Sequence, residues 1–123
     1  MRKTIFMLAI VALMAIALVA CGGGSSSSST SASGVNVTVS LTEFKFDPMN
    51  VTVSPGQTVN LTLINKGSID HTWVVVGTAV KFTVGAGKTT TQTFTAPAAG
   101  TYVIDCDIAG HKEAGMVGQL IVK

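Results

Sequence analysis

Apolar and polar side chains alternate along much of the chain after residue 34, and the first run is the most regular. Val35, Val37, Val39 and Leu41 are apolar, whereas the residues between and after them, at positions 36, 38, 40 and 42, are polar. A period of two places successive side chains on opposite faces, as in a strand with one buried face. Residues 35–42 are therefore predicted to form a β-strand.

Further short segments of the same character follow up to the C-terminus. They cover residues 49–53, 59–63, 71–76, 80–84, 90–94, 100–106 and 116–123. Gly, Pro and Asn residues separate them, and Pro55-Gly56 suits a tight turn. No sustained helical period occurs between residues 35 and 123. We predict an all-β domain of about eight strands, arranged as a Greek-key β-sandwich or small barrel.

Tyr102 follows Ala99-Gly100 at the start of a predicted strand. It fits either a tyrosine corner, in which the hydroxyl bonds back to the backbone, or an ordinary core tyrosine. The sequence leaves both interpretations open.

The first twenty residues have a different pattern. Arg2 and Lys3 precede an apolar run over residues 5–20, which is typical of a secretory signal peptide. As a helix the run would be roughly 24 Å long, short of the ~30 Å hydrocarbon core, so an uncleaved anchor is the second choice. We expect residues 1–20 to be a signal peptide and the protein to be exported.

Cys21 follows Leu18-Val19-Ala20, and this segment resembles the lipobox of bacterial lipoproteins. The resemblance implies that Cys21 is lipidated and holds the protein on the outer face of a bacterial membrane, on the periplasmic or extracellular side. Residues 22–34 are rich in Gly and Ser and lack the apolar groups that offset ordering entropy. We interpret residues 21–34 as a lipidated cysteine with a flexible tether, and residues 35–123 as one domain.

The charge balance and the cysteine content restrict the range of functions that the chain can have. Without Arg2 and Lys3 the remaining lysines equal the six acidic residues in number, which argues against a nucleic-acid partner. With Cys21 taken by lipid, Cys106 has no disulfide partner. An unpaired cysteine in an exported protein is either well buried or chemically used.

One segment near the C-terminus, DCDIAGHKEAGM, suggests a use for Cys106. Four residues separate Cys106 from His111, and four separate His111 from Met116. A thiolate, imidazoles and a weak thioether suit copper in both oxidation states. The chain has one other histidine, His71, at the start of a predicted strand. Each residue alone is commonly a packing or surface residue, but together they indicate a copper site.

With these residues the chain resembles the cupredoxins, the small type 1 blue copper proteins, over residues 35–123. The spacing in the loop is similar to that of auracyanin and rusticyanin and longer than that of plastocyanin. The resemblance implies one copper ion, with His71, Cys106 and His111 as strong ligands and Met116 as a long axial ligand. Where the family often has Asn after the upstream histidine, this chain has Thr72, whose hydroxyl is expected to make a similar bond.

Asp105 and Asp107 flank the thiolate in sequence. Because negative charge favours Cu(II), we expect them to lower the reduction potential. A site with four protein ligands has no open position for a substrate, so the chain is expected to carry electrons and not to be an enzyme. Small or apolar residues beside His111 are predicted to form a docking patch for transient redox partners such as membrane electron-transfer complexes or cytochromes: Ile108, Ala109, Gly110, Ala114 and Gly115.

Other functions make distinguishable predictions. Multicopper and binuclear copper enzymes need more histidines or cysteines than this chain offers. A copper-sequestering or copper-delivering protein remains an alternative, since it would bind Cu(I) without a blue Cu(II) form. An adhesion module without metal would tolerate the loss of Cys106.

Overall fold

The computed structural model describes residues 34–123, which form nine strands. The predicted signal peptide, the predicted lipidation of Cys21 and the tether up to residue 33 lie outside the described residues. None of the described segments is a helix of the length and apolarity that crossing a membrane requires.

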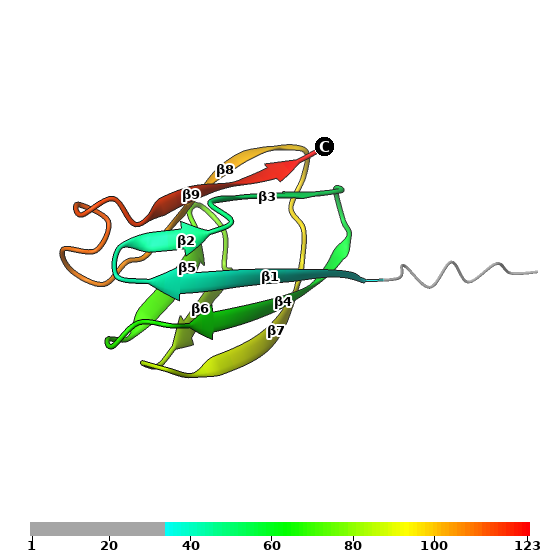
Figure 1. Ribbon diagram of the computed structural model, residues 1–123. Coiled ribbons are helices and arrows are strands. Elements are labelled where there is room, and N and C mark those ends of the chain that lie inside the picture. The colour runs from blue at the N-terminus through cyan, green and yellow to red at the C-terminus, as the bar shows by residue number, and fades with distance from the viewer. Residues whose placement is uncertain (1–33) are drawn as a thin grey trace, which may run out of the picture.

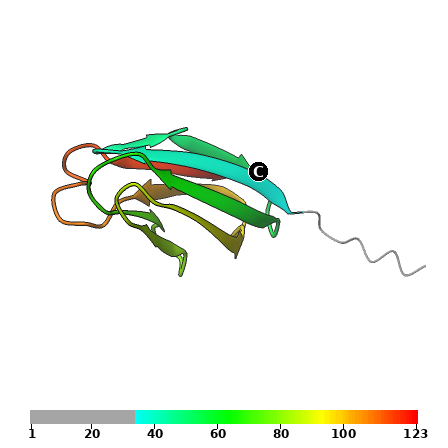
Figure 2. The same ribbon diagram turned by 60° about the horizontal axis from the view of Figure 1, so that its bottom comes forward.

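The strands form two sheets that face each other (Figures 1 and 2). The first sheet contains, in spatial order, β2 (Lys45–Asp47), β1 (Val35–Thr42), β4 (Thr58–Asn65) and β7 (Thr89–Thr95). The second contains β3 (Asn50–Val53), β9 (Val117–Val122), β8 (Gly100–Asp105), β5 (His71–Val75) and β6 (Lys81–Val84). The chain passes repeatedly from one sheet to the other, so β1–β4 and β3–β9 are parallel and the other pairs are antiparallel. The predicted β-sandwich is confirmed.

The predicted alternation accounts for the core between the sheets. In β4 every second side chain, Val59, Leu61 and Leu63, is fully buried. Trp73 from the second sheet and Phe94 from the first meet across the interior, with ring centroids 5.7 Å apart. Burying large aromatic and branched side chains from both layers holds the sheets together, since each contributes roughly 1.5–3 kcal/mol.

The structure has one strand more than the sequence predicts. The extra strand is β2, which pairs with the end of β1 and buries only Phe46. Three residues are too few for an alternation to be recognised, so the sequence pattern could not identify it. The Tyr102 hydroxyl donates to the carbonyl of Ala98 at 2.9 Å, which is the bond of a tyrosine corner.

Candidate metal centre

The loop of residues 106–116 joins β8 to β9 at one end of the sandwich (Figure 1). The backbone N–H of Cys106 donates to the carbonyl of Met116 at 3.2 Å, and the N–H of Met116 donates to the carbonyl of His111 at 3.0 Å. The two ends of the loop are therefore tied together as an extension of the β8–β9 ladder. Three of the predicted ligands are fixed by these two bonds.

Tight turns inside the loop direct His111 towards Cys106. The N–H of His111 donates to the carbonyl of Ile108 at 3.0 Å, and the N–H of Ala114 donates to the carbonyl of Gly110 at 3.1 Å. Gly110 and Gly115 have φ angles of 86° and 104°, in a region that side chains rarely allow. These glycines permit the loop to fold back, so they have a structural role as well as their predicted place in the docking patch.

The opposite predicted ligand, His71, begins β5, and the loop before it is held by Asn65, which sequence analysis missed. The Asn65 amide donates to the carbonyls of Ile69 at 2.8 Å and Val84 at 3.2 Å, and its oxygen accepts the N–H of Gly67 at 2.9 Å. Asn65 is only 2% exposed. A polar residue at a core position of an alternating strand was the available signal.

Three side-chain donors meet between β5 and the loop. The Nδ1 atoms of His71 and His111 are 3.3 Å apart, and the Cys106 Sγ is 3.3 Å from the His111 Nδ1. All three donors lie within 4.8 Å of one another. His71 and Cys106 are 0% exposed and His111 is 8% exposed, so water has little access. Met116 is also fully buried.

The donors fit a metal ion. Metal–nitrogen bonds of about 2.0 Å and metal–sulfur bonds of about 2.3 Å place trigonal donors roughly 3.5–3.7 Å apart, close to the separations present. Burial, and then the nearby His111, hold the pKa of His71 below its usual value. A neutral imidazole keeps its lone pair for a metal. Two imidazoles and a thiolate are the strong donors of blue-copper sites.

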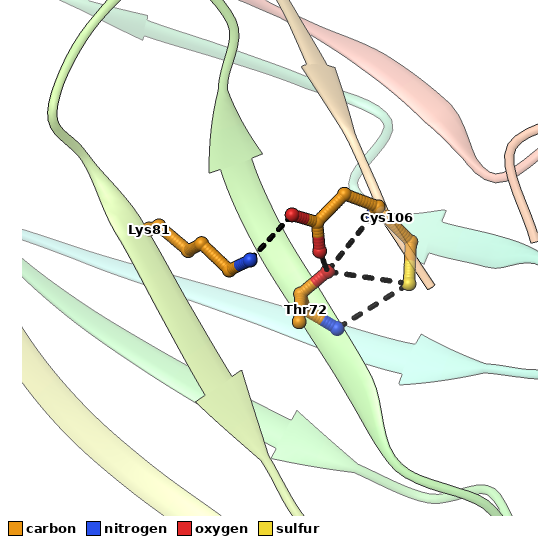
Figure 3. A network of polar contacts seen from close by, with 4 residues as sticks. Thr72, Lys81 and Cys106 are labelled. Carbon is orange, nitrogen blue, oxygen red and sulfur yellow. Dashed lines mark hydrogen bonds and ion pairs between the residues drawn. The ribbon is translucent and has the colours of Figure 1, made fainter. Parts of the chain in front are cut away.

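The Cys106 sulfur accepts a hydrogen bond from the backbone of Thr72, on the strand that carries His71. The N–H of Thr72 lies 3.3 Å from the Sγ, and the Thr72 hydroxyl lies 3.5 Å from it. The hydroxyl also bonds to Asp107, as carboxylate oxygen Oδ1 is 2.8 Å away and the Asp107 N–H is 2.9 Å away. Figure 3 shows Thr72 between Lys81 and Cys106. Thr72 thus connects the β5 strand to the loop of residues 106–116, called the ligand loop below.

Each aspartate beside Cys106 has a lysine partner. Lys81 lies 2.5 Å from Asp107, and Lys112 lies 2.8 Å from the buried carboxylate of Asp105. The hydrogen bond from Lys81, with that of Thr72, holds the pKa of Asp107 below its usual value. The bond to Asp105 raises the pKa of Lys112. The effect predicted from two uncompensated negative charges must therefore be smaller than the sequence suggests.

Phe44 is a site residue that sequence analysis missed. Its ring packs edge-on against His111, with centroids 5.2 Å apart, although the side chain is 40% exposed. Its φ angle is 65°, an unfavourable value for a bulky residue. The preceding Glu43 accepts bonds from the N–H and hydroxyl of Ser68, at 2.6 and 2.9 Å, which hold this turn against the loop before His71. No sequence pattern indicates this contact.

The five predicted patch residues lie on the loop around His111. Ile108 is half-buried, and the others are exposed: Ala109, Gly110, Ala114 and Gly115. Two exposed apolar side chains, Phe44 and Ile69, belong to the turn and the loop that Glu43 joins. Lys112 and Glu113 are the charged residues between the patch members.

A family model described as "Cupredoxin-like domain" matches residues 9–122. The chain belongs to the cupredoxin-like family. It is 34% identical to auracyanin-A of Chloroflexus aurantiacus over 94% of each chain. It is 33% identical to the copper-resistant cuproprotein CopI of Rubrivivax gelatinosus over 72% of this chain and 66% of CopI.

A solved structure has the same fold. Reduced auracyanin from Roseiflexus castenholzii superposes with a TM-score of 0.65 at 26% identity, covering 72% of this chain and 96% of auracyanin. The cupredoxin-like fold and the buried His, Cys, His donor set together assign one copper ion as the cofactor. This agrees with the cofactor predicted from the sequence.

Proposed function

We propose that the protein is a blue copper protein that carries single electrons. His71, Cys106 and His111 would hold the copper, with Met116 as a weak fourth ligand. The convergence of three buried donors from β5 and the 106–116 loop carries this proposal. When bound, copper supplies a one-electron Cu(I)/Cu(II) couple.

The residues around the donors suit electron transfer better than catalysis. Backbone bonds fix Cys106, His111 and Met116 relative to one another, and Thr72 fixes Cys106 relative to β5. Fixed ligands limit rearrangement when the charge of the metal changes. Burial of the donors excludes water and leaves little room for a substrate, whereas catalytic metal sites keep an open position.

The similarity to auracyanin-A supports the proposal of an electron-carrying copper protein, because the similarity extends over nearly the whole of both chains. A structure of auracyanin A is described as that of a "blue" copper protein, and this chain matches it with a TM-score of 0.59 at 27% identity. A blue colour in such sites reports a copper–thiolate bond. We therefore expect the same colour here.

We further propose that the protein is exported and held on the outer face of a bacterial membrane by lipid on Cys21. The apolar leader and the Gly/Ser-rich tether support this location. The partners would be membrane redox complexes or cytochromes that touch the loop around His111. Transient electron-transfer contacts of this kind bury less than about 1,200 Å². Cys21→Ser should release the protein from membranes, and its retention there would contradict the lipid anchor.

The absorption spectrum of the copper-loaded protein tests the central proposal. We expect an intense visible band that disappears on adding ascorbate and returns on reoxidation. A colourless Cu(II) protein without a reversible couple would contradict the electron carrier. Met116→Leu should keep the band and raise the potential, because a sulfur donor near the metal is lost. Met49→Leu is the matched control, since Met49 is 52% exposed.

Copper handling is the second candidate, and the similarity to CopI favours it. A protein that delivers copper must release it readily. The donors here are 0–8% exposed, which favours retention over release. Rapid transfer of Cu(I) to a competing chelator, together with an absent blue band, would support copper handling instead.

A further inference from the structure

The Thr72 hydroxyl has one proton and two acceptors within reach. Asp107 Oδ1 lies 2.8 Å from the hydroxyl oxygen, and Cys106 Sγ lies 3.5 Å from it. The same oxygen accepts the N–H of Asp107 at 2.9 Å, which fixes its position. The proton can be donated to only one of the two acceptors at a time.

The distances favour the carboxylate. Hydrogen bonds from a hydroxyl to an ionised oxygen are short and strong, whereas the contact to sulfur is longer. Lys81 holds the other carboxylate oxygen, Oδ2, at 2.5 Å. Lys81 on β6 lies opposite Val74 on β5, the strand that also carries Thr72. Lys81 therefore holds the Asp107 carboxylate next to the Thr72 hydroxyl (Figure 3).

We propose that Lys81 and Asp107 hold the Thr72 hydroxyl proton away from the Cys106 sulfur and thereby keep the reduction potential low. The sulfur is left with the hydrogen bond from the Thr72 N–H at 3.3 Å. Thr72 and Asp107 are positioning residues, which would affect the copper only through the hydrogen bonds that the Cys106 thiolate accepts. This inference rests on the proposed copper site.

The direction follows from the chemistry of the ligand. A hydrogen bond to a thiolate withdraws electron density from the sulfur, which weakens its donation to Cu(II) more than to Cu(I). A second hydrogen bond would therefore raise the potential. Removal of the Asp107 carboxylate frees the hydroxyl to rotate towards the sulfur, which is already within hydrogen-bonding range of a sulfur acceptor.

A double-mutant cycle separates this effect from simple charge. Asp107→Ala should raise the potential of the copper-loaded protein both by removing a negative charge and by releasing the hydroxyl. In the Thr72→Val background only the charge effect remains. We expect the rise to be smaller there by about threefold to tenfold in the electron-transfer equilibrium constant, roughly 30–60 mV at 59 mV per tenfold. Equal rises in both backgrounds would overturn the proposal.

Two further variants serve as controls. Thr72→Ser keeps a hydroxyl, so Asp107→Ala should again produce the full rise in that background; a small rise would contradict the proposal. Asp105→Asn removes a charge beside the same thiolate without a bond to Thr72. Asp105→Asn should shift the potential by the same amount in the unchanged protein and in the Thr72→Val variant. An unequal shift would contradict the assignment of the hydroxyl effect to Asp107.

Unfolding of the copper-free protein by urea tests the hydrogen bonds without the metal. Thr72→Val and Asp107→Ala both remove the bond between the Thr72 hydroxyl and the Asp107 carboxylate, so the double variant should lose less stability than the two single losses together. Additive losses would overturn the proposal. A protein that lacks the blue band contradicts the copper function, whereas a blue protein with equal potential rises contradicts only the Thr72 mechanism.

Discussion

The ring of Phe44 packs edge-on against His111, and its backbone adopts a φ angle of 65° to do so. A left-handed conformation costs a bulky residue roughly 1–2 kcal/mol, so neighbouring bonds must maintain it. Glu43 provides these bonds, because its carboxylate accepts hydrogen bonds from the N–H and the hydroxyl of Ser68. The exposed edge of the metal centre is thus partly covered by an aromatic ring from the opposite sheet.

Phe44→Gly should be less destabilising than Phe44→Ala by about 1 kcal/mol, because glycine adopts the left-handed conformation without strain. Both variants remove the ring from His111 and should accelerate the removal of copper by a chelator. Urea unfolding of the copper-free protein and the rate of copper loss check the two effects. Equal stabilities would contradict the strain, and unchanged copper loss would show that Phe44 does not shield His111.

Cys106→Ala should abolish the blue band and leave a folded sandwich. The lost sulfur is fully buried and small, so the copper-free protein should lose only about 1–2 kcal/mol of unfolding free energy. Copper should raise the melting temperature of the unchanged protein and have a much smaller effect on this variant, because a ligand that binds the folded state stabilises it. Calorimetry with and without copper measures both. Equal stabilisation by copper would contradict the site.

The copper-free protein should become less stable as pH falls from about 7.5 to about 5. Burial lowers the pKa of His71 in the folded state, whereas in the unfolded chain it has a pKa of about 6.5. The unfolded chain therefore binds a proton first, and stability decreases below about pH 6.5. Urea unfolding across this range measures the decrease. His71→Gln should show a smaller decrease, and an unchanged decrease would contradict the assignment.

Gly118→Ala should destabilise the second sheet by about 1–3 kcal/mol, as overpacking does. A Cβ at Gly118 would overlap the carbonyl oxygen of Met49, next to the start of β3. Gly85→Ala is the matched control, since its Cβ would have ordinary contacts of 3.5 Å or more. Thermal unfolding compares the two. Similar melting temperatures would show that β3 moves aside at little cost.

Alternation in the sequence was enough to predict the sandwich, because strands such as β4 and β9 bury every second side chain. It could not reveal β2, where a single residue, Phe46, is buried. The spacing of Cys106, His111 and Met116, with His71 as the other histidine, led to the prediction of a copper site, and the structure brings both histidines and Cys106 together. Contacts that depend on three-dimensional approach could not be predicted, and these include the two carbonyls that the Asn65 amide reaches, Phe44 on His111, and the lysine partners of both aspartates.

The bond between the Cys106 N–H and the Met116 carbonyl closes the ligand loop at its base. The strands of the sandwich below this bond do not depend on the number of residues in the loop. Mutations between the two residues can therefore alter the surface offered to a partner while both sheets stay unchanged. Under the proposed docking role of this loop, differences in partner choice among related proteins should concentrate in this short segment, and exchanging it between them should redirect electron transfer.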